Sequence, residues 1–373
     1  MRKKYVVLFI TFLSLVSCSD KDEQYIAVSP VKVDLTLVPY PKLSDYHFFE
    51  GEIKNLNPSL NVIPYEPASS LFSDYALKKR FVWLPQGKKA TYTTADKIIE
   101  LPIGAALIKS FYYTNVQPDN TTRIIETRVM IRKSNGWLFA DYVWNEQQNE
   151  AYLDLNGSNQ QLSWKDETNT IRSVNYRIPN KVQCNVCHKY KETINGVYFE
   201  KQEPIGIKPQ NLNFNYNYGS EIKNQLAKWI EVGYLDSNFI FPTSANTIVD
   251  YNDSSKPIEL RVRSYFDINC SHCHNTNGHC DYRPMEFSFN KTGLPNGVGQ
   301  SNMGVCVPTQ DLQEFPPALS KIITPGNTAR SMLFYRLNTD NENYRMPLHG
   351  RTMIHQEGIN LVEEWINTLS TCQ

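Results

Sequence analysis

An excess of charge of either sign is absent from this sequence, which has 38 Lys and Arg residues and 38 Asp and Glu residues. Removing the basic residues of the N-terminal leader described below leaves a formal net charge of −3, so no basic field is available for nucleic acid. After residue 15 the chain also lacks an apolar run of the roughly 20 residues that a membrane-spanning helix needs. Internal repeats, low-complexity tracts and a Ser/His/Asp or catalytic carboxylate signature are missing too.

The N-terminus has the features of a bacterial lipoprotein signal. Residues 1–17 start with a basic segment (residues 2–4) and continue in a short apolar run, which predicts a signal peptide. Residues 15–18, Leu-Val-Ser-Cys, resemble a lipobox, so Cys18 is the predicted lipidation site. An ordinary signal peptide followed by a coincidental cysteine is the alternative. We expect an exported lipoprotein anchored in the cell envelope, at the outer-membrane or the periplasmic face, with its lipid as the membrane anchor.

Two short stretches carry one pattern, C-x-x-C-H. Its residues are Cys184, Cys187 and His188 in the first stretch and Cys270, Cys273 and His274 in the second. This is the attachment signature of a c-type haem. Two thiols within one helical turn can add to the two vinyl groups of one porphyrin, and the histidine that follows can bind the iron. We therefore predict two covalently bound haem c groups, with both histidines as iron ligands. A single motif could instead be a chance match or a redox-active thiol pair.

The remaining cysteines fit an oxidising compartment. Cys280, Cys306 and Cys372 are left after lipidation and haem attachment, so at most one pair can form among them. We predict a disulfide between Cys280 and Cys306, because both follow the second motif in one long insertion, and a free Cys372. Sequence alone does not fix the pairing.

The composition along the chain predicts a multi-domain α+β protein. After the signal peptide, residues 18–45 are expected to comprise the lipidated cysteine and a linker that contains several prolines. Short β-branched and aromatic runs in residues 46–178 predict an antiparallel β-sandwich-like domain. The expected strands cover 80–84, 97–101, 106–113, 123–132, 137–144 and 151–155.

Helical signals begin at the first motif. Residues 179–256 are expected to form a mainly helical first haem segment, with a helix after Asn180 and another over 220–234. Residues 257–373 are expected to hold a helix that starts at Pro257, a helix after 327–328 and a closing helix over 355–369.

Residues 257–373 resemble the class I cytochrome c domain, in which a loop methionine binds the iron opposite the motif histidine. Met346 precedes Pro347 and the apolar closing helix, so the resemblance implies Met346 as the distal ligand of the second haem. Alternative methionines are Met303, Met332 and Met353. The histidines at 272, 279, 349 and 355 are expected to be polar surface or loop residues. Met/His ligation raises the potential above that of bis-His ligation.

The distal ligand of the first haem is not evident, because no Met and no His lies between His188 and Cys270. Met130 or His47 from the β-rich region, a Lys or a Tyr could bind the iron. An open coordination position is a further alternative, and it would allow peroxide chemistry.

The chain also resembles a family of diheme cytochrome lipoproteins at residues outside the two motifs. These are Leu-Phe-Ser-Asp-Tyr (71–75), Glu-Thr-Arg (126–128) before Trp137, Val-Trp-Asn (143–145) and Asn-Gln-Leu (224–226). Members pair an aromatic-rich β-domain with two C-x-x-C-H motifs and are often encoded beside a parallel β-helix protein. The resemblance implies haem, export and a redox partner protein, such as that β-helix protein or a dehydrogenase.

Three functions follow as hypotheses. Electron transfer through two haems is favoured over a haem peroxidase with an open first site, and over a redox-sensing or carbohydrate- or protein-binding module.

Overall fold

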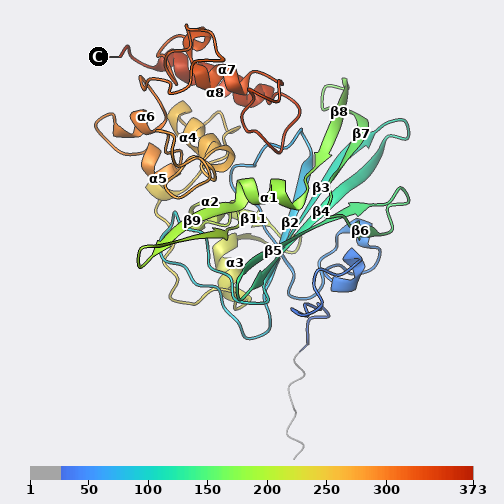
Figure 1. The fold of residues 1–373 in the computed structure, drawn as a ribbon. Coiled ribbons are helices and arrows are strands. Elements are labelled where there is room, and N and C mark those ends of the chain that lie inside the picture. Colours follow the sequence, from blue (N-terminus) through green and yellow to red (C-terminus); the bar gives the residue numbers. More distant parts are fainter. Residues whose placement is uncertain (1–26, 373) are drawn as a thin grey trace, which may run out of the picture.

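The computed structural model describes residues 27–372, and its largest element is one antiparallel sheet of eight strands (Figure 1). The strands are β1 (Ile63–Pro64), β2 (Leu77–Trp83), β3 (Ala106–Val116), β4 (Thr121–Lys133), β5 (Gly136–Trp144), β6 (Ala151–Leu153), β7 (Ser158–Lys165) and β8 (Ile171–Ile178). β1 to β6 follow one another in sequence order, and β7 pairs with both β3 and β8. Successive side chains of a strand point to opposite faces, so this sheet has two faces to cover.

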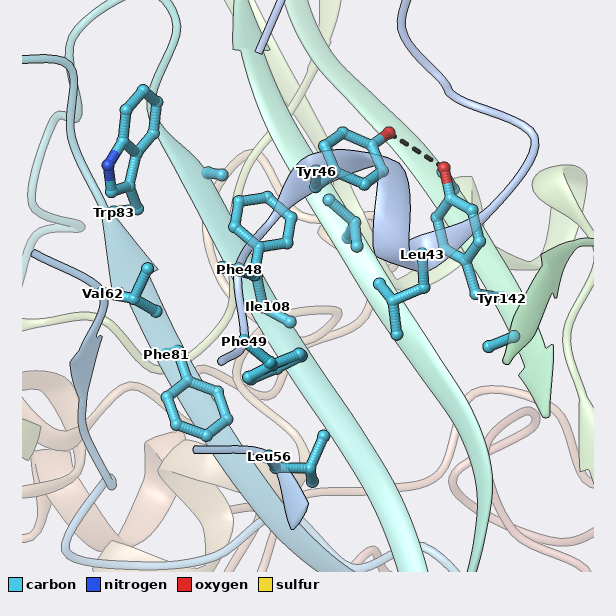
Figure 2. Close-up of a cluster of buried hydrophobic side chains, with 14 of the residues drawn as sticks. Leu43, Tyr46, Phe48, Phe49, Leu56, Val62, Phe81, Trp83, Ile108 and Tyr142 are labelled. Atoms are coloured by element: carbon cyan, nitrogen blue, oxygen red, sulfur yellow. Dashed lines mark hydrogen bonds between the residues drawn. The ribbon is translucent and has the colours of Figure 1, made fainter. Parts of the chain in front are cut away.

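The N-terminal segment covers one face of the sheet. It contains the short 3-10 helices η1 (Leu43–Tyr46) and η2 (Ile53–Asn55). Figure 2 shows Tyr46 and Phe48 of this segment over the strands, with the Tyr46 hydroxyl 2.9 Å from that of Tyr142 on β5. Seven of the 18 buried residues of this core are aromatic, and the hydroxyl pair satisfies the polar ends of two of them.

Residues 179–256 cover part of the opposite face. Their elements are α1 (Lys181–His188), β9 (Lys189–Ile194), β10 (Val197–Gln202), α2 (Pro209–Leu212), β11 (Asn215–Asn217), β12 (Ile222–Asn224), α3 (Gln225–Glu231) and η3 (Ser244–Asn246). Leu226 and Trp229 of α3 share one buried cluster with Val82 and Leu107 of the sheet. The segment is therefore built onto the sheet, with two small hairpins between its short helices.

Residues 257–372 form a second buried cluster beside the sheet. Their helices are α4 (Ile258–Asn269), α5 (Phe289–Thr292), α6 (Val298–Asn302), η4 (Thr328–Arg330), α7 (Met332–Leu337) and α8 (Gln356–Thr368). Phe266 of α4 packs against Trp365 of α8, with ring centroids 5.9 Å apart. No helix among the described residues is long and apolar enough to cross a membrane.

The predicted fold class is wrong. Strands hold 26% of the residues and helices 21%, so the chain is β-rich around a single sheet, not a sandwich followed by a mainly helical haem region that ends in a cytochrome c-like domain. In residues 179–256 the apolar positions that suggested a helix over 220–234 are divided between two elements. Ile222 lies in β12 and is exposed, whereas Leu226 and Trp229 lie in the short helix α3 and are buried against the sheet.

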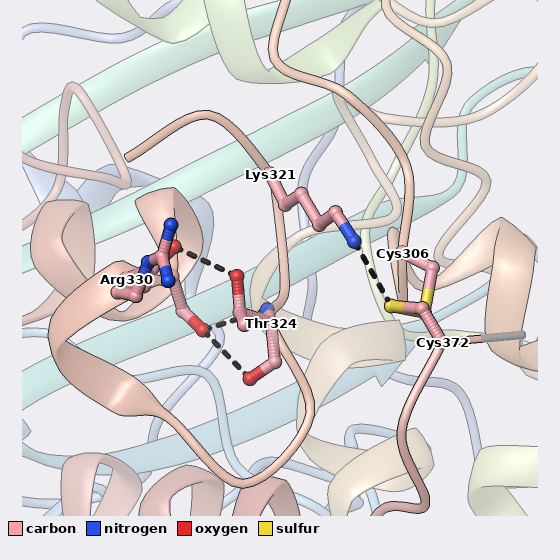
Figure 3. Close-up of a disulfide and its surroundings, with 6 residues drawn as sticks. Cys306, Lys321, Thr324, Arg330 and Cys372 are labelled. Atoms are coloured by element: carbon pink, nitrogen blue, oxygen red, sulfur yellow. Dashed lines mark hydrogen bonds between the residues drawn. A yellow bond between two sulfur atoms is a disulfide. The ribbon is translucent and has the colours of Figure 1, made fainter. Parts of the chain in front are cut away.

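The predicted disulfide between Cys280 and Cys306 is also wrong. Cys306 pairs with Cys372, whose Cα lies 5.7 Å away (Figure 3). The packing of α8 against α4 and α7 brings the chain end back to the loop that carries Cys306. Cys280 is instead a buried free thiol.

Candidate functional site

The first motif occupies the one turn of helix that its spacing requires. Asn180 caps α1, because its side chain accepts a hydrogen bond from the Gln183 amide at 2.9 Å while the Gln183 side chain accepts one from the Asn180 amide. Cys184, Cys187 and His188 follow within this helix. The predicted short helix and its cap are therefore confirmed.

His188 is oriented as a ligand histidine. Its Nδ1 lies 2.6 Å from the Glu203 carbonyl oxygen, an arrangement that lets Nδ1–H donate and leaves Nε2 for a metal. Its ring packs against Phe139 of β5, with centroids 4.8 Å apart. Burial lowers the pKa of His188 to about 4, so the ring is neutral at neutral pH, the form that binds metals.

The second motif begins where α4 ends. The Cys270 amide still donates to the Phe266 carbonyl at 2.9 Å, and the His274 amide donates to the Cys270 carbonyl at 2.9 Å. His274 is buried, and its Nδ1 has no hydrogen-bond partner within residues 27–372. Burial lowers the pKa of His274 to about 4 as well. Each motif thus presents one neutral imidazole.

The two motifs lie against each other. Ligand atoms of Cys187, His272 and Cys273 all lie within 4.8 Å of one another, and the Cys273 sulfur is 4.0 Å from the Val186 carbonyl oxygen. A hydrogen bond from Cys273 lowers the pKa of the Cys187 thiol, whereas burial raises the pKa of Cys184 to about 12. In Figure 1, α1 lies where the sheet meets the C-terminal helices. His272 is expected to be a surface or loop residue, and it lies in the turn of the second motif with intermediate burial; no local sequence pattern indicates its contact with Cys187.

A cavity of about 520 Å³ opens beside the second motif. Cys270, Cys273 and His274 line it together with Met346. The rest of the wall combines apolar side chains (Phe266, Phe287, Ile322, Met332 and Leu333) with polar ones such as Arg283, Asp311 and Arg336. Binding sites for cofactors are typically concave and apolar with a few polar groups. The structure therefore brings the predicted distal methionine into the same cavity as the motif histidine.

The alternative methionines are placed differently. Met303 is fully buried in the C-terminal core, and Met353 packs near the sheet. Met332 lines the cavity with Met346, so it remains the competing ligand.

A second cavity of about 330 Å³ lies on the Glu203 side of the first motif. Its lining is polar and includes His188, Lys201, Glu203 and Lys208. Of the candidate distal ligands, Met130 lies opposite Phe139 in the ladder, on the sheet face that carries α1. His47 is exposed at the end of η1, on the other face of the sheet. The structure thus separates His47 from the first motif.

The segment before β2 holds the loop that carries Met346. The Asp74 carboxylate accepts hydrogen bonds from the Thr352 amide at 2.7 Å, the Thr352 hydroxyl at 2.9 Å and the Met353 amide at 2.8 Å. Phe72 stacks on His355, with ring centroids 4.1 Å apart. His355, expected to be a surface or loop residue, lies in the loop that leads into α8 and is buried there.

Asp74 is held in a restricted conformation. It is buried, and both Asp74 and Tyr75 have positive φ angles, 50° and 64°. Such backbone strain persists only where surrounding contacts fix it. Burial raises the pKa of Asp74, while the hydrogen bonds from the loop act against that rise.

No family model matches the chain, and no curated protein or solved structure is significantly similar to it.

Proposed function

We propose that the protein is a diheme electron carrier, in which each C-x-x-C-H motif holds one covalent haem c. The observation that carries the proposal is the contact between the two motifs, whose ligand atoms from Cys187, His272 and Cys273 lie within 4.8 Å of one another. Two thioether bonds at Cys187 and Cys273 would place the attachment edges of the two groups side by side. Short separation between redox groups suits transfer of electrons within one chain.

The residues fit the group at the second motif. Cys270 and Cys273 would hold it, His274 offers a neutral imidazole, and Met346 lies in the same cavity of about 520 Å³. The His274 ring is buried, and its Nδ1 has no hydrogen-bond partner within residues 27–372, which supports a role as a ligand. Haem iron supplies reversible one-electron oxidation and reduction, tuned by its axial ligands. Apolar side chains such as Phe266, Phe287 and Ile322 line the cavity beside His274 and would shield part of a bound group from water.

The residues of the first motif also fit a haem, but its distal iron ligand is not identified. Cys184 and Cys187 would hold the group, and the Glu203 carbonyl fixes His188 with Nε2 free. An open position there is the basis of the peroxidase alternative, which a spin-state measurement tests directly.

A metal ion between the motifs is the second candidate. Two thiols and one imidazole from Cys187, Cys273 and His272 form a donor set that suits a tetrahedral zinc ion with one open position. A zinc site would use one cysteine of each motif and would leave Cys184 and Cys270 without a function. His272 distinguishes the zinc proposal from the haem proposal, because only the zinc site would use it.

We expect the purified protein to contain two covalent haems per chain by pyridine haemochrome assay and intact mass. The double variant Cys184→Ala with Cys187→Ala should retain one haem, because its second motif is intact, and Cys270→Ala with Cys273→Ala should do the same. His272→Ala should keep both.

A haem-free wild type with one zinc ion, lost in His272→Ala, would contradict the electron-carrier proposal. A high-spin ferric signal that disappears with the first motif, together with peroxide turnover, would favour the peroxidase instead.

The membrane anchor lies outside the described residues and is proposed from the leader and Cys18 alone. Cys18→Ser should move the protein from the membrane to the soluble fraction, since a lipid chain adds about 0.8 kcal/mol of membrane affinity per buried methylene. Membrane flotation after export checks this. A Ser17→Ala control should stay membrane-bound, and a Cys18→Ser chain that still floats would place the anchor elsewhere.

A further inference from the structure

Three basic side chains form a row across the sheet, on the face that carries the first motif. Arg80 on β2 lies directly opposite Lys109 on β3, and Lys109 lies opposite Arg128 on β4. Like charges that face each other in a ladder are destabilising. A fold that needed only a stable sheet would not be expected to keep this row.

The row is only partly neutralised. Arg128 forms a bidentate pair with the buried Glu126, at 3.0 and 2.5 Å. Within residues 27–372, no side-chain hydrogen bond or ion pair involves Arg80, Lys109 or the neighbouring Lys78. Arg80 is only 6% exposed, whereas Lys78 and Lys109 are half-buried. The Lys109 Nζ lies over the Phe111 ring, 4.6 Å from its centroid, and Glu126 acts on Lys109 only at longer range. The three basic side chains therefore lie close together without a direct carboxylate partner.

Burial makes these charges costly. It lowers the pKa of Lys78 to about 7 and that of Lys109 well below its usual range, and the charge of Arg80 adds to both effects. A buried cation without a counter-ion is strongly unfavourable. An anionic group bound here would remove that penalty.

The row lies next to the first motif. Phe139, which packs against the His188 ring at 4.8 Å, is two residues from Asp141 on the same strand face. Asp141 lies directly opposite Arg128 at the end of the cation row. The charge of Lys109 also acts on His188, and the charges of Arg128 and Asp141 act on Cys184. A group bonded to Cys184 and Cys187 is thus within reach of the row.

We propose that Lys78, Arg80 and Lys109 bind the two propionate carboxylates of the haem held at the first motif. The inference rests on the proposed function. A guanidinium suits bidentate binding of one carboxylate, and the two ammonium groups suit point contacts with the other. Two carboxylates would also bring two negative charges to three basic groups that form no ion pair, and would favour the charged form of both lysines. Lys78, Arg80 and Lys109 would then orient the porphyrin over the sheet and raise its potential, because nearby positive charge favours the reduced iron.

Redox titration of full-length, haem-loaded protein tests the proposal. Lys109→Met and Arg80→Gln should each shift the midpoint potential of the first haem to more negative values, and the second haem should shift less. Lys109→Arg keeps the charge and should stay close to wild type. Lys79→Met is the matched control, because Lys79 is exposed on the same strand and should leave both potentials unchanged. Unchanged potentials in both row variants, with both haems attached, would overturn the inference.

A stability cycle gives a second measurement. In the haem-loaded protein Lys109→Met should lower the midpoint of thermal unfolding. In the Cys184→Ala, Cys187→Ala background, which would lack the first haem, the same change should raise it, since it removes a basic group that faces Arg80 and Arg128 without a direct carboxylate partner. Equal effects in the two backgrounds would contradict a role of Lys109 in binding the haem.

Two further outcomes separate the possible failures. Absence of haem from the first motif of the wild type overturns the proposed function itself, whatever the row does. Stabilisation of the fully loaded wild type by added phosphate or succinate, lost in Lys109→Met, would show that the row binds a free anion. A first haem that is low spin in the wild type and high spin in Lys109→Met would show that Lys109 is an iron ligand. Either result overturns the propionate assignment alone.

Discussion

Met346→Ala is expected to convert the haem at the second motif from low spin to high spin and to lower its potential. A thioether stabilises ferrous iron, and axial ligands tune haem potentials over roughly 0.8 V, so loss of the sulfur should shift the potential by a sizeable part of that range. The loop around Met346 is well fixed, because its amide donates to the Arg336 carbonyl at 2.8 Å and its carbonyl accepts from Arg351 at 3.0 Å. The sulfur-to-iron charge-transfer band and a redox titration measure the effect.

Two methionines serve as controls for this prediction. Met332→Ala changes the wall of the same cavity and should leave the charge-transfer band in place. Met303→Ala should lower stability by about 2–5 kcal/mol, as truncation of a buried core methionine does, without moving the potential. If the band is lost in Met332→Ala and kept in Met346→Ala, the ligand assignment is wrong.

Asp74→Ala is expected to release the loop that carries Met346. It removes an acceptor of three hydrogen bonds from Thr352 and Met353 and leaves alanine at a positive φ of 50°. Unpaired amides and this backbone conformation together should lower the free energy of unfolding by about 2–4 kcal/mol. Urea unfolding measures the loss, and a weaker charge-transfer band should accompany it.

Asp74→Asn gives the matched comparison. Asparagine tolerates positive φ and keeps one acceptor oxygen for the loop amides, so it should retain most of the stability and the band. Asp253→Ala removes an exposed aspartate whose hydrogen bonds are local to Ser255 and should have little effect. Equal stability of Asp74→Ala and wild type would show that the loop is held by its other contacts.

Local patterns predicted local structure well. The expected strands at 80–84, 106–113, 123–132 and 137–144 correspond to β2, β3, β4 and β5, because alternating apolar residues face two buried sides. The helices after Pro257 and over 355–369 also correspond to α4 and α8. β7 and β8 were missed, since their sequences are mostly polar and only a few residues, such as Trp164, are buried. No strand forms over 97–101.

Contacts between distant segments could not be predicted. Asp74 and Thr352 are separated by 278 positions, and no pattern in the sequence of either segment indicates their hydrogen bond. The contact between Cys187 and Cys273 depends equally on how two separately built parts pack. Arg80, Lys109 and Arg128 are ordinary strand residues in the sequence, and only the strand register puts them in one row.

The contact between Cys187 and Cys273 also bears on the order of events in the proposed maturation. In the folded chain the two sulfurs lie within 4.8 Å of each other, and an oxidising compartment would favour their cross-linking. On the proposed function, haem attachment would therefore compete with folding in time. A chain that folded first would bring two thiols needed for haem within range of each other, so attachment before folding would protect both sites.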